Sequence, residues 1–215
     1  MNIVFDFGAV LFAWHPLDLV AHAFPEIANT PQSAREFAQS VFAHPDWLDF
    51  DRGLVDREGI AALTASRLAL DVRRVSALVD SVEENLVPLP ESLTVLRELH
   101  AQRQSASDSV TGLYFLSNMS VPFSRTLEER YDFLTWFDGG IFSGDVQRVK
   151  PEAAIYEMLQ SRYALNPATT IFIDDMPYNV DAARELGWHA IHFTGAAALR
   201  LALSGLFSAQ SQAAR

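Results

Sequence analysis

Beyond about residue 110, short apolar segments rich in β-branched and aromatic residues alternate with longer segments of helical periodicity. We expect strands at 112–116, 140–142, 170–173 and 189–193, and helices at about 121–130, 151–163, 180–186 and 196–203. Another strand is expected in the apolar run that starts at Asn2 and carries its single charge, Asp6, near its end. Regular alternation of strand and helix favours a parallel sheet covered by helices. The sequence therefore predicts an α/β fold.

One stretch departs from this alternation. Residues 15–88, between Trp14 and Leu89, contain no convincing strand, and their apolar residues fall at helical spacings. We expect three or four helices here, with loops at 28–31, 44–47 and 51–53, followed by a helix that Pro90 opens. The predicted organisation is a core formed by 1–14 and 89–207, a helical insertion at 15–88, and a frayed tail at 208–215.

Composition limits the partners of this chain. Its 215 residues carry a net charge of -11, which disfavours nucleic acid and anionic membranes as partners. The absence of cysteine excludes disulfides and thiolate chemistry. The longest uncharged run, 109–124, is too polar to span a bilayer, and the first residues do not resemble a secretory signal. We therefore expect a cytoplasmic protein without a membrane partner.

Polar side chains follow several of the predicted strands. In open parallel sheets, ligands bind outside the carboxyl ends of the strands, so these side chains are expected to share one edge. They are Asp6, then Ser117 and Asn118, then Asp174 and Asp175, with Lys150 at the start of the helix after the 140–142 strand. Each alone is also compatible with turn chemistry, a helix cap or a solvated lysine. Their joint placement indicates a functional site.

The residue types suit metal-assisted phosphoryl transfer. Asp6 and Asp175 offer hard oxygen ligands for Mg²⁺, and the Gly8 carbonyl can complete the set. An ionised Asp6 is a plausible nucleophile toward phosphorus.

Other side chains of this edge could bind the phosphoryl group. Ser117 and the backbone amide of Asn118 could donate to a phosphoryl oxygen, while Lys150 could neutralise both Asp6 and that group. Asn179, four residues after Asp175, could orient Lys150 or a metal-bound water.

Four segments in this order resemble the motifs of the haloacid dehalogenase (HAD) superfamily. They are Asp6-Phe-Gly-Ala-Val, Phe-Leu-Ser117-Asn118, Val-Lys150-Pro-Glu, and Phe-Ile-Asp174-Asp175 with Asn179 after it. The resemblance covers nearly the whole chain. It implies a Rossmann-like, doubly wound parallel core with an inserted helical C1 cap, as in subfamily IA. It also implies that Asp6 is the nucleophile and that Gly8 and Asp175 bind Mg²⁺, with Asp174 as a nearer or outer carboxylate. Ser117 and Lys150 would bind the phosphoryl group.

The sequence departs from this resemblance at Gly8. Phosphatases of the superfamily usually carry a second Asp there, which acts as general acid and base. Such help is worth roughly 10²- to 10⁴-fold, so its absence puts efficient monoester hydrolysis in question. The Asp-x-Gly-x-Val form resembles bacterial sugar-phosphate phosphatases, to which the N-terminal domains of soluble epoxide hydrolases are related. His15 could replace the acid if the turn brought it inward; the alternative is a hinge residue packed beside Trp14.

These observations lead to three functional hypotheses. The first is a Mg²⁺-dependent phosphatase that acts on a small phosphorylated metabolite, with sugar phosphates as one candidate class. The second is a haloacid dehalogenase, against which the Asp174-Asp175 pair argues because that reaction needs no metal. The third is a regulatory protein that binds phosphate or metal without turnover.

The helical insertion would choose the substrate, since a closing lid presents its side chains to the leaving group. We expect the loops near 44–53 to face the core, with Trp47 and Arg52 as candidate substrate contacts; for Arg52 a solvent-facing side chain is the favoured alternative. The chain is expected to be a monomer or a homodimer.

Overall fold

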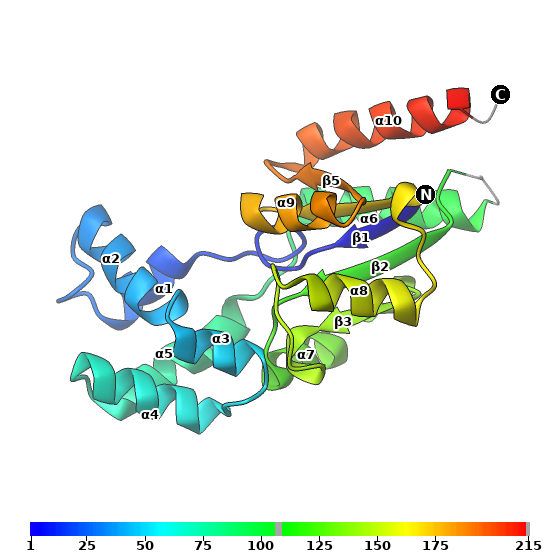
Figure 1. Cartoon of the computed structure of the whole chain (residues 1–215). Coiled ribbons are helices and arrows are strands. Elements are labelled where there is room, and N and C mark those ends of the chain that lie inside the picture. Colours follow the sequence, from blue (N-terminus) through cyan, green and yellow to red (C-terminus); the bar gives the residue numbers. More distant parts are fainter. Residues whose placement is uncertain (106–108, 214–215) are drawn as a thin grey trace.

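The computed structural model describes residues 1–105 and 109–213, and its core is a parallel five-stranded sheet. The strands are ordered β3-β2-β1-β4-β5 (Figure 1). Their bounds are β1 Asn2–Phe5, β2 Gly112–Ser117, β3 Gly139–Phe142, β4 Thr170–Asp174 and β5 His189–His192. All four pairings are parallel, which confirms the predicted α/β class and places the carboxyl ends of the strands at one edge.

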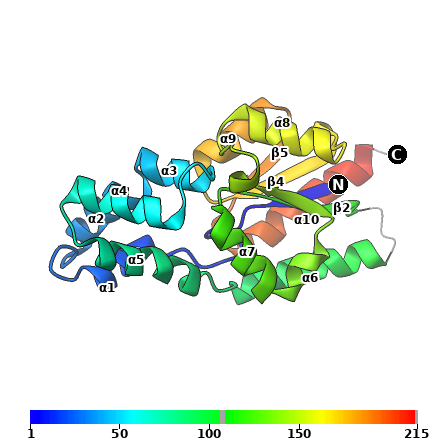
Figure 2. The same cartoon turned by 90° about the horizontal axis from the view of Figure 1, so that it is seen from below.

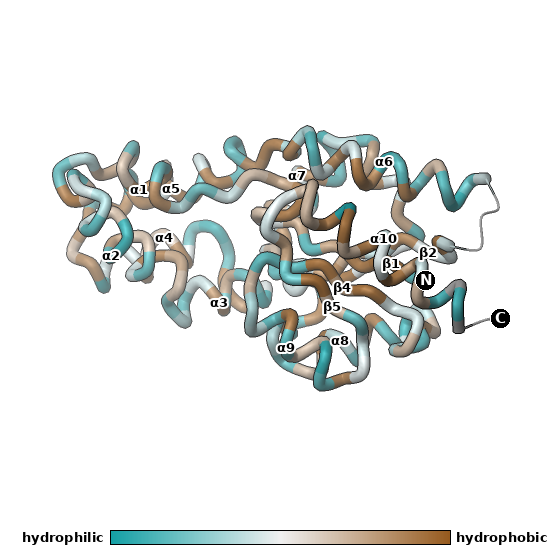
Figure 3. The backbone as a smooth tube through the Cα atoms, turned by 90° about the horizontal axis from the view of Figure 1, so that it is seen from above, coloured by the Kyte–Doolittle hydropathy of each residue, from teal (hydrophilic) through white to brown (hydrophobic). Residues whose placement is uncertain are grey.

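Side chains alternate between the two faces of the sheet, and each face has its own core. Ile3 and Phe5 of β1 belong to the larger cluster of buried residues, whereas Val4 between them belongs to the smaller one. The central strands β1 and β4 are buried on both faces and therefore read as continuous apolar runs (Figure 3). A strand in this position tolerates a charge only at its end, where Asp6 lies.

Helices cover both faces of the sheet (Figure 2). Buried residues of α6 (Pro90–Gln104), α7 (Val121–Arg130) and α10 (Ala196–Ala213) join the larger cluster. Those of α8 (Ala153–Arg162) and α9 (Pro177–Glu185) join the smaller one. Within the described residues, the core also contains three short 3₁₀ helices, η1 (Asp132–Trp136), η2 (Ser143–Asp145) and η3 (Pro167–Thr169).

A cap of five helices is inserted between β1 and α6 and lies beside the carboxyl ends of the strands (Figure 1). The helices are α1 Pro16–Ala23, α2 Pro31–Phe42, α3 Pro45–Asp51, α4 Arg57–Leu68 and α5 Val72–Asn85. Local signals start them: Thr30 and Ser33 form a capping box at α2, and the Asp56 side chain accepts the Gly59 N–H at α4.

The cap contains one helix more than the upper expected number. Pro16 and Pro45 each open a short helix, because proline is favoured at the first helical position. Trp47 consequently lies on α3 rather than in the loop expected at 44–47.

Two linker segments that lie side by side connect the cap to the core. The Ala13 N–H donates to the Val87 carbonyl at 2.8 Å, and the Leu89 N–H donates to the Leu11 carbonyl at 2.8 Å. This pairing holds the two linkers together, while the exact domain boundaries stay a prediction.

The C-terminal expectation was wrong for the residues that the structure describes. The tail expected to fray from residue 208 continues α10 as far as Ala213. Alanine and glutamine residues, which have good helix propensity, extend a helix whose earlier turns are anchored by Leu199 and Leu203. Residues 214–215 lie outside the described part. No helix among the described residues is both long and apolar enough to cross a bilayer.

Candidate active site

Three adjacent strands bring the predicted polar residues to one edge of the sheet. Asp6 follows β1, Ser117 ends β2 and Asp174 ends β4, and β1 lies between the other two strands. Asp6 is 7% exposed and Asp174 is fully buried, so both carboxylates require partners. The edge of the sheet therefore concentrates negative charge in a place shielded from water.

Lys150 supplies the compensating charge. Its Nζ lies 2.8 Å from Asp6 Oδ1 and 2.6 Å from Asp174 Oδ2, and the lysine itself is 3% exposed. Burial lowers the pKa of this ammonium group, but the Asp174 and Asp6 carboxylates outweigh it and raise the pKa above its usual value. Lys150 is thus held as a cation between the two carboxylates.

The two oxygens of Asp6 have different surroundings. Oδ1 accepts hydrogen bonds from the Phe7 N–H at 2.7 Å and pairs with Lys150. Oδ2 has no hydrogen bond or ion pair among residues 1–105 and 109–213. Burial raises the pKa of Asp6 to about 7, Lys150 opposes that shift, and Asp174 and Asp175 add to it. The site therefore presents one free carboxylate oxygen on a side chain that is fixed by the other.

Asp174 and Asp175 have separate environments despite being neighbours. Both oxygens of Asp174 are engaged, with the Met176 N–H, the Asn179 amide and Lys150. Asp175 is partly buried and lines the cavity described below. Burial raises its pKa, and the adjacent Asp174 carboxylate adds to that effect. The Asp174 oxygens are thus both occupied by partners within the protein, whereas Asp175 faces the cavity.

A divalent cation fits this carboxylate cluster. One oxygen from each of Asp6, Asp174 and Asp175 lies within 4.8 Å of the others. The buried Asn179 Oδ1 has no partner among the described residues, so an acceptor is available for a metal-bound water. Hard oxygen ligands with waters suit Mg²⁺, and a cation would remove the repulsion that raises these pKa values.

Gly8 leaves open space where a side chain could be. A Cβ built at Gly8 meets no heavy atom within 4 Å, and this glycine is not among those with positive φ. The missing second Asp is therefore not excluded by sterics. The side chain of His15 is exposed and lies outside the cavity lining, so His15 does not take over that role.

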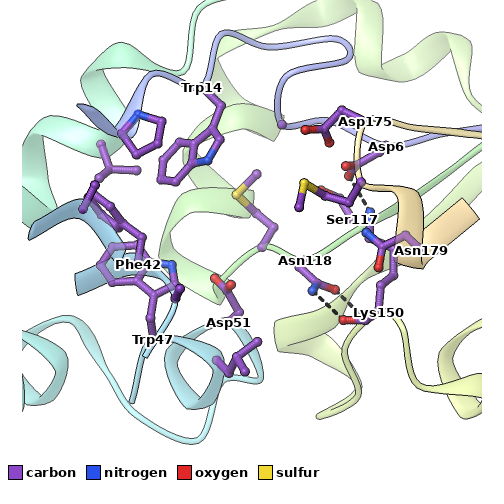
Figure 4. Close-up of a pocket in the computed structure, with 18 of the residues that line it drawn as sticks. Asp6, Trp14, Phe42, Trp47, Asp51, Ser117, Asn118, Lys150, Asp175 and Asn179 are labelled. Carbon is purple, nitrogen blue, oxygen red and sulfur yellow. Dashed lines mark hydrogen bonds and ion pairs between the residues drawn. The ribbon is translucent and has the colours of Figure 1, made fainter. Parts of the chain in front are cut away.

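A cavity of about 390 Å³ extends from the carboxylates into the cap (Figure 4). Its core end is lined by Asp6, Gly8, Ser117, Asn118, Lys150, Asp175, Tyr178 and Asn179. Its cap end is lined mainly by aromatic and aliphatic side chains, among them Trp14, Phe42 and Trp47. The two ends together form a chamber of the size usual for small-molecule sites.

Residues 2–187 match the family model of the haloacid dehalogenase-like hydrolases. The chain belongs to this family. As an HAD-like hydrolase it is an enzyme, and the four motifs found in the sequence are the segments that converge on the site above.

Similar proteins include phosphatases. The HAD-like hydrolase is 27% identical over 204 residues to a sesquiterpene phosphatase of Aspergillus oryzae, a match that covers 94% of each chain. Its fold resembles that of an HAD family enzyme of Bacteroides thetaiotaomicron in complex with magnesium and inorganic phosphate. That likeness has a TM-score of 0.64 at 18% identity and covers 88% of this chain and 92% of the other.

A dehalogenase has the same fold. The L-2-haloacid dehalogenase of Xanthobacter autotrophicus matches with a TM-score of 0.60 at 21% identity, over 88% of this chain and 75% of that one. The fold therefore does not separate the two reactions, and the site residues must do so.

The structure of the HAD-like hydrolase brings most of the predicted residues together. Trp47 lines the cavity from α3, and its contact with substrate stays a prediction. Arg52 does not line it; its guanidinium donates to the Glu152 carboxylate, with Nη1 at 3.2 Å from Oε2, and joins cap to core. The side chain of Asn118 is directed to the Lys150 main chain.

Sequence reasoning gave no role to several cavity residues. Phe42, Met119 and Phe123 line the chamber but read in the sequence as ordinary apolar positions. Asp51 also lines it; the sequence placed Asp51 in the cap loop expected to face the core but assigned it no chemical role. These residues converge through tertiary packing, which a local pattern does not reveal.

Proposed function

We propose that this HAD-like hydrolase is a Mg²⁺-dependent phosphatase that acts on a small phosphorylated metabolite through an aspartyl-phosphate on Asp6. The observation that carries the proposal is the state of Asp6, whose Oδ1 is fixed by Lys150 while Oδ2 is unpaired beside an accessible cavity. A nucleophile held in this way needs little reorganisation to attack phosphorus.

The surrounding residues have complementary roles in this proposal. Lys150 and Ser117 would hold the phosphoryl oxygens, together with the Asn118 backbone amide, and Lys150 would balance their charge. Asp6, Asp175 and the Gly8 carbonyl would hold Mg²⁺, with Asp174 and Asn179 behind them. When bound, the cation neutralises phosphoryl charge and allows an anionic substrate to enter a carboxylate-rich site.

Two other hypotheses are less well supported. Dehalogenation needs no metal, so it leaves the cluster of Asp6, Asp174 and Asp175 without a purpose. A protein that binds phosphate without turnover is compatible with the glycine at position 8. The phosphate-release experiment below distinguishes it from a phosphatase. A cytoplasmic location and a monomeric or homodimeric state stay predictions.

The test is release of inorganic phosphate from p-nitrophenyl phosphate, with Mg²⁺ and with chelator. An aryl phosphate has a good leaving group and therefore tests the nucleophile without a general acid. We expect metal-dependent turnover that Asp6→Asn abolishes and Asp181→Asn, an exposed control with a side chain 65% exposed, leaves intact. Undiminished turnover in Asp6→Asn would contradict the proposal, and Mg²⁺ binding without turnover would favour the binding protein.

A further inference from the structure

The cap end of the cavity has an aromatic wall. Trp14 packs edge to face on Phe42 with ring centroids 5.2 Å apart, and Phe42 packs on Trp47 at 4.7 Å. Behind the lining, Trp47 contacts the fully buried Phe50 at 5.4 Å, and Phe50 contacts Phe123 of the core helix α7, which lines the cavity again, at 5.3 Å. Rings that fix one another in this geometry form a preformed apolar surface.

Polar groups are few at this end of the cavity. Among the described residues, the cap contributes Arg35, Gln39 and Asp51 as the polar side chains of the lining, and Arg35 and Gln39 are exposed. The hydroxyl groups of a bound sugar would need hydrogen-bond partners along the interior wall, and an unmatched buried hydroxyl is costly. The lining is thus poorly suited to a sugar.

We propose that the cap end of the cavity binds an apolar organic group, so that the substrate is the phosphate monoester of a hydrocarbon alcohol. This rests on the proposed phosphatase function, because the apolar wall is continuous with the phosphoryl site at Asp6 and Lys150. The charged phosphate would lie at the core end and the hydrocarbon between Trp14, Phe42 and Trp47 (Figure 4).

The experiment compares three substrates with Mg²⁺ present: decyl phosphate, glucose phosphate and p-nitrophenyl phosphate. We expect KM for decyl phosphate to be at least roughly tenfold below that for glucose phosphate, since apolar contacts discriminate on this scale. A KM for glucose phosphate equal to or below that for decyl phosphate would overturn the inference. If no phosphate were released from any of the three substrates, the aryl phosphate included, the phosphatase function itself would be refuted.

Binding gives a readout without turnover. Trp14 and Trp47 line the cavity, so a bound ligand should change tryptophan fluorescence in the Asp6→Asn variant. We expect saturable quenching by decyl phosphate and none by glucose phosphate at the same concentration. Quenching by glucose phosphate alone would contradict an apolar site even if no substrate were hydrolysed.

A matched pair of cap variants locates the site. Leu48 lines the cavity and is 37% exposed, whereas Leu63 is 44% exposed and does not line it. Leu48→Gln should raise KM for decyl phosphate roughly tenfold and leave that for p-nitrophenyl phosphate within a few-fold. Leu63→Gln should change neither. Equal effects of the two substitutions would show that the cap wall does not contact the organic group.

A different observation concerns the missing acid at position 8. Asp51 ends α3 and, among the described residues, is the acidic side chain that the cap contributes to the cavity lining (Figure 4). Its carbonyl accepts a hydrogen bond of 2.6 Å from Ser143 Oγ, which in turn accepts the Met119 N–H at 2.8 Å. The end of α3 is therefore anchored to the core next to the end of β2.

Asp51 lies between Trp47 at the cap end and Asn118 at the core end of the cavity (Figure 4). A phosphate monoester that spans the two ends would carry its bridging oxygen through this part of the cavity. We infer that Asp51 is the general acid and base that replaces the absent second Asp. Burial raises the pKa of this carboxyl to about 7, Lys150 opposes the shift and Asp6 adds to it. The other charged side chains of the cavity lining are Arg35 and Asp175, and the adjacent Arg52 is paired with Glu152.

The proton transfers balance in both steps. As Asp6 Oδ2 forms a bond to phosphorus, the bond from phosphorus to the organic oxygen breaks, and protonated Asp51 gives that oxygen its proton. The Asp51 carboxylate then takes a proton from the water that attacks the aspartyl-phosphate. The bond between phosphorus and Asp6 breaks with its electron pair returning to Asp6, and inorganic phosphate leaves with Asp51 protonated again.

Leaving-group dependence tests this role. Asp51→Asn should lower kcat/KM for decyl phosphate by roughly 10²- to 10⁴-fold, because kcat/KM reports the steps up to release of the organic group, and an alkoxide needs protonation there. It should lower kcat/KM for p-nitrophenyl phosphate far less, and that retained reactivity shows that the variant is folded. Asp49→Asn, on the same helix with a side chain 49% exposed, is the control. Equal losses on both substrates would contradict an acid role.

Rescue provides an independent readout. Because a Cβ at Gly8 meets nothing within 4 Å, Gly8→Asp can place a carboxyl at the vacant position. Added to Asp51→Asn, it should restore part of the decyl phosphate turnover. If the double variant is no faster than Asp51→Asn, although its aryl phosphate activity persists, the two positions do not share a function.

Discussion

The side chain of Asn118 holds the main chain of Lys150 at both polar groups. The Lys150 N–H donates to Asn118 Oδ1 at 2.8 Å, and Asn118 Nδ2 donates to the Lys150 carbonyl at 3.1 Å. The lysine that compensates Asp6 is thus positioned from the end of the neighbouring strand β2. Because the side-chain amide of Asn118 is occupied by the Lys150 main chain, we expect Asn118 to affect the site by positioning Lys150.

Asn118→Ala should therefore lower kcat/KM for p-nitrophenyl phosphate by roughly 10- to 100-fold, the usual effect of removing a residue that orients a site. The loss arises because Lys150 is no longer fixed relative to Asp6. Steady-state kinetics measure it, with Asn85→Ala on the exposed surface of the cap as control. Wild-type kinetics in Asn118→Ala would show that the hydrogen bonds between Asn118 and Lys150 do not contribute to activity.

Lys150→Met should strongly destabilise the enzyme without metal. Removing the cation leaves Asp6 and Asp174 buried without compensation, and breaking a buried pair costs about 3–5 kcal/mol. The free energy of unfolding in urea with chelator measures the effect. Added Mg²⁺ should recover part of the loss if the carboxylates bind it. A variant as stable as the wild type in chelator would contradict the assigned charge balance.

Arg52→Ala should affect cap closure more than stability. The Arg52–Glu152 pair joins α3 to the start of α8, but it is partly exposed and worth at most about 1 kcal/mol. We expect KM for p-nitrophenyl phosphate to rise by up to roughly fivefold, the factor that such an energy allows, with little change in kcat. Arg73→Ala, whose side chain is 91% exposed, is the control. A fall in kcat at constant KM would argue against a closure role.

Asp51→Asn should change how stability depends on pH. The pKa of Asp51 is raised to about 7 in the folded state from 3.8, so folding favours the protonated carboxyl. Its contribution to stability is therefore fully present below pH 3.8 and is lost as pH rises through 7. In chelator, the Tm of Asp51→Asn relative to the wild type should increase between pH 4 and pH 8. A constant difference would show that Asp51 titrates normally.

The sequence predicted the part of the site that is determined by strand ends. Asp6, Ser117 and Asp174 could be placed together because parallel strands align their carboxyl ends, whatever the details of packing. Lys150 and Asp175 followed because each is close in sequence to such an end. The cap was less predictable: Arg52 pairs with Glu152 rather than facing the cavity, and α3 occupies part of an expected loop.

Local periodicity and the order of chemical residue types determined the α/β class, the inserted cap and the phosphoryl end of the site, because these depend on backbone connectivity. Only the tertiary structure decided which side chains form the cap side of the cavity, opposite the phosphoryl end. The wall from Trp14 to Phe123 and the carboxyl of Asp51 come from segments far apart in the chain, and their meeting depends on how cap helices pack on the core. Packing of this kind is set by the shapes of many side chains at once, so no local pattern in the sequence reports it.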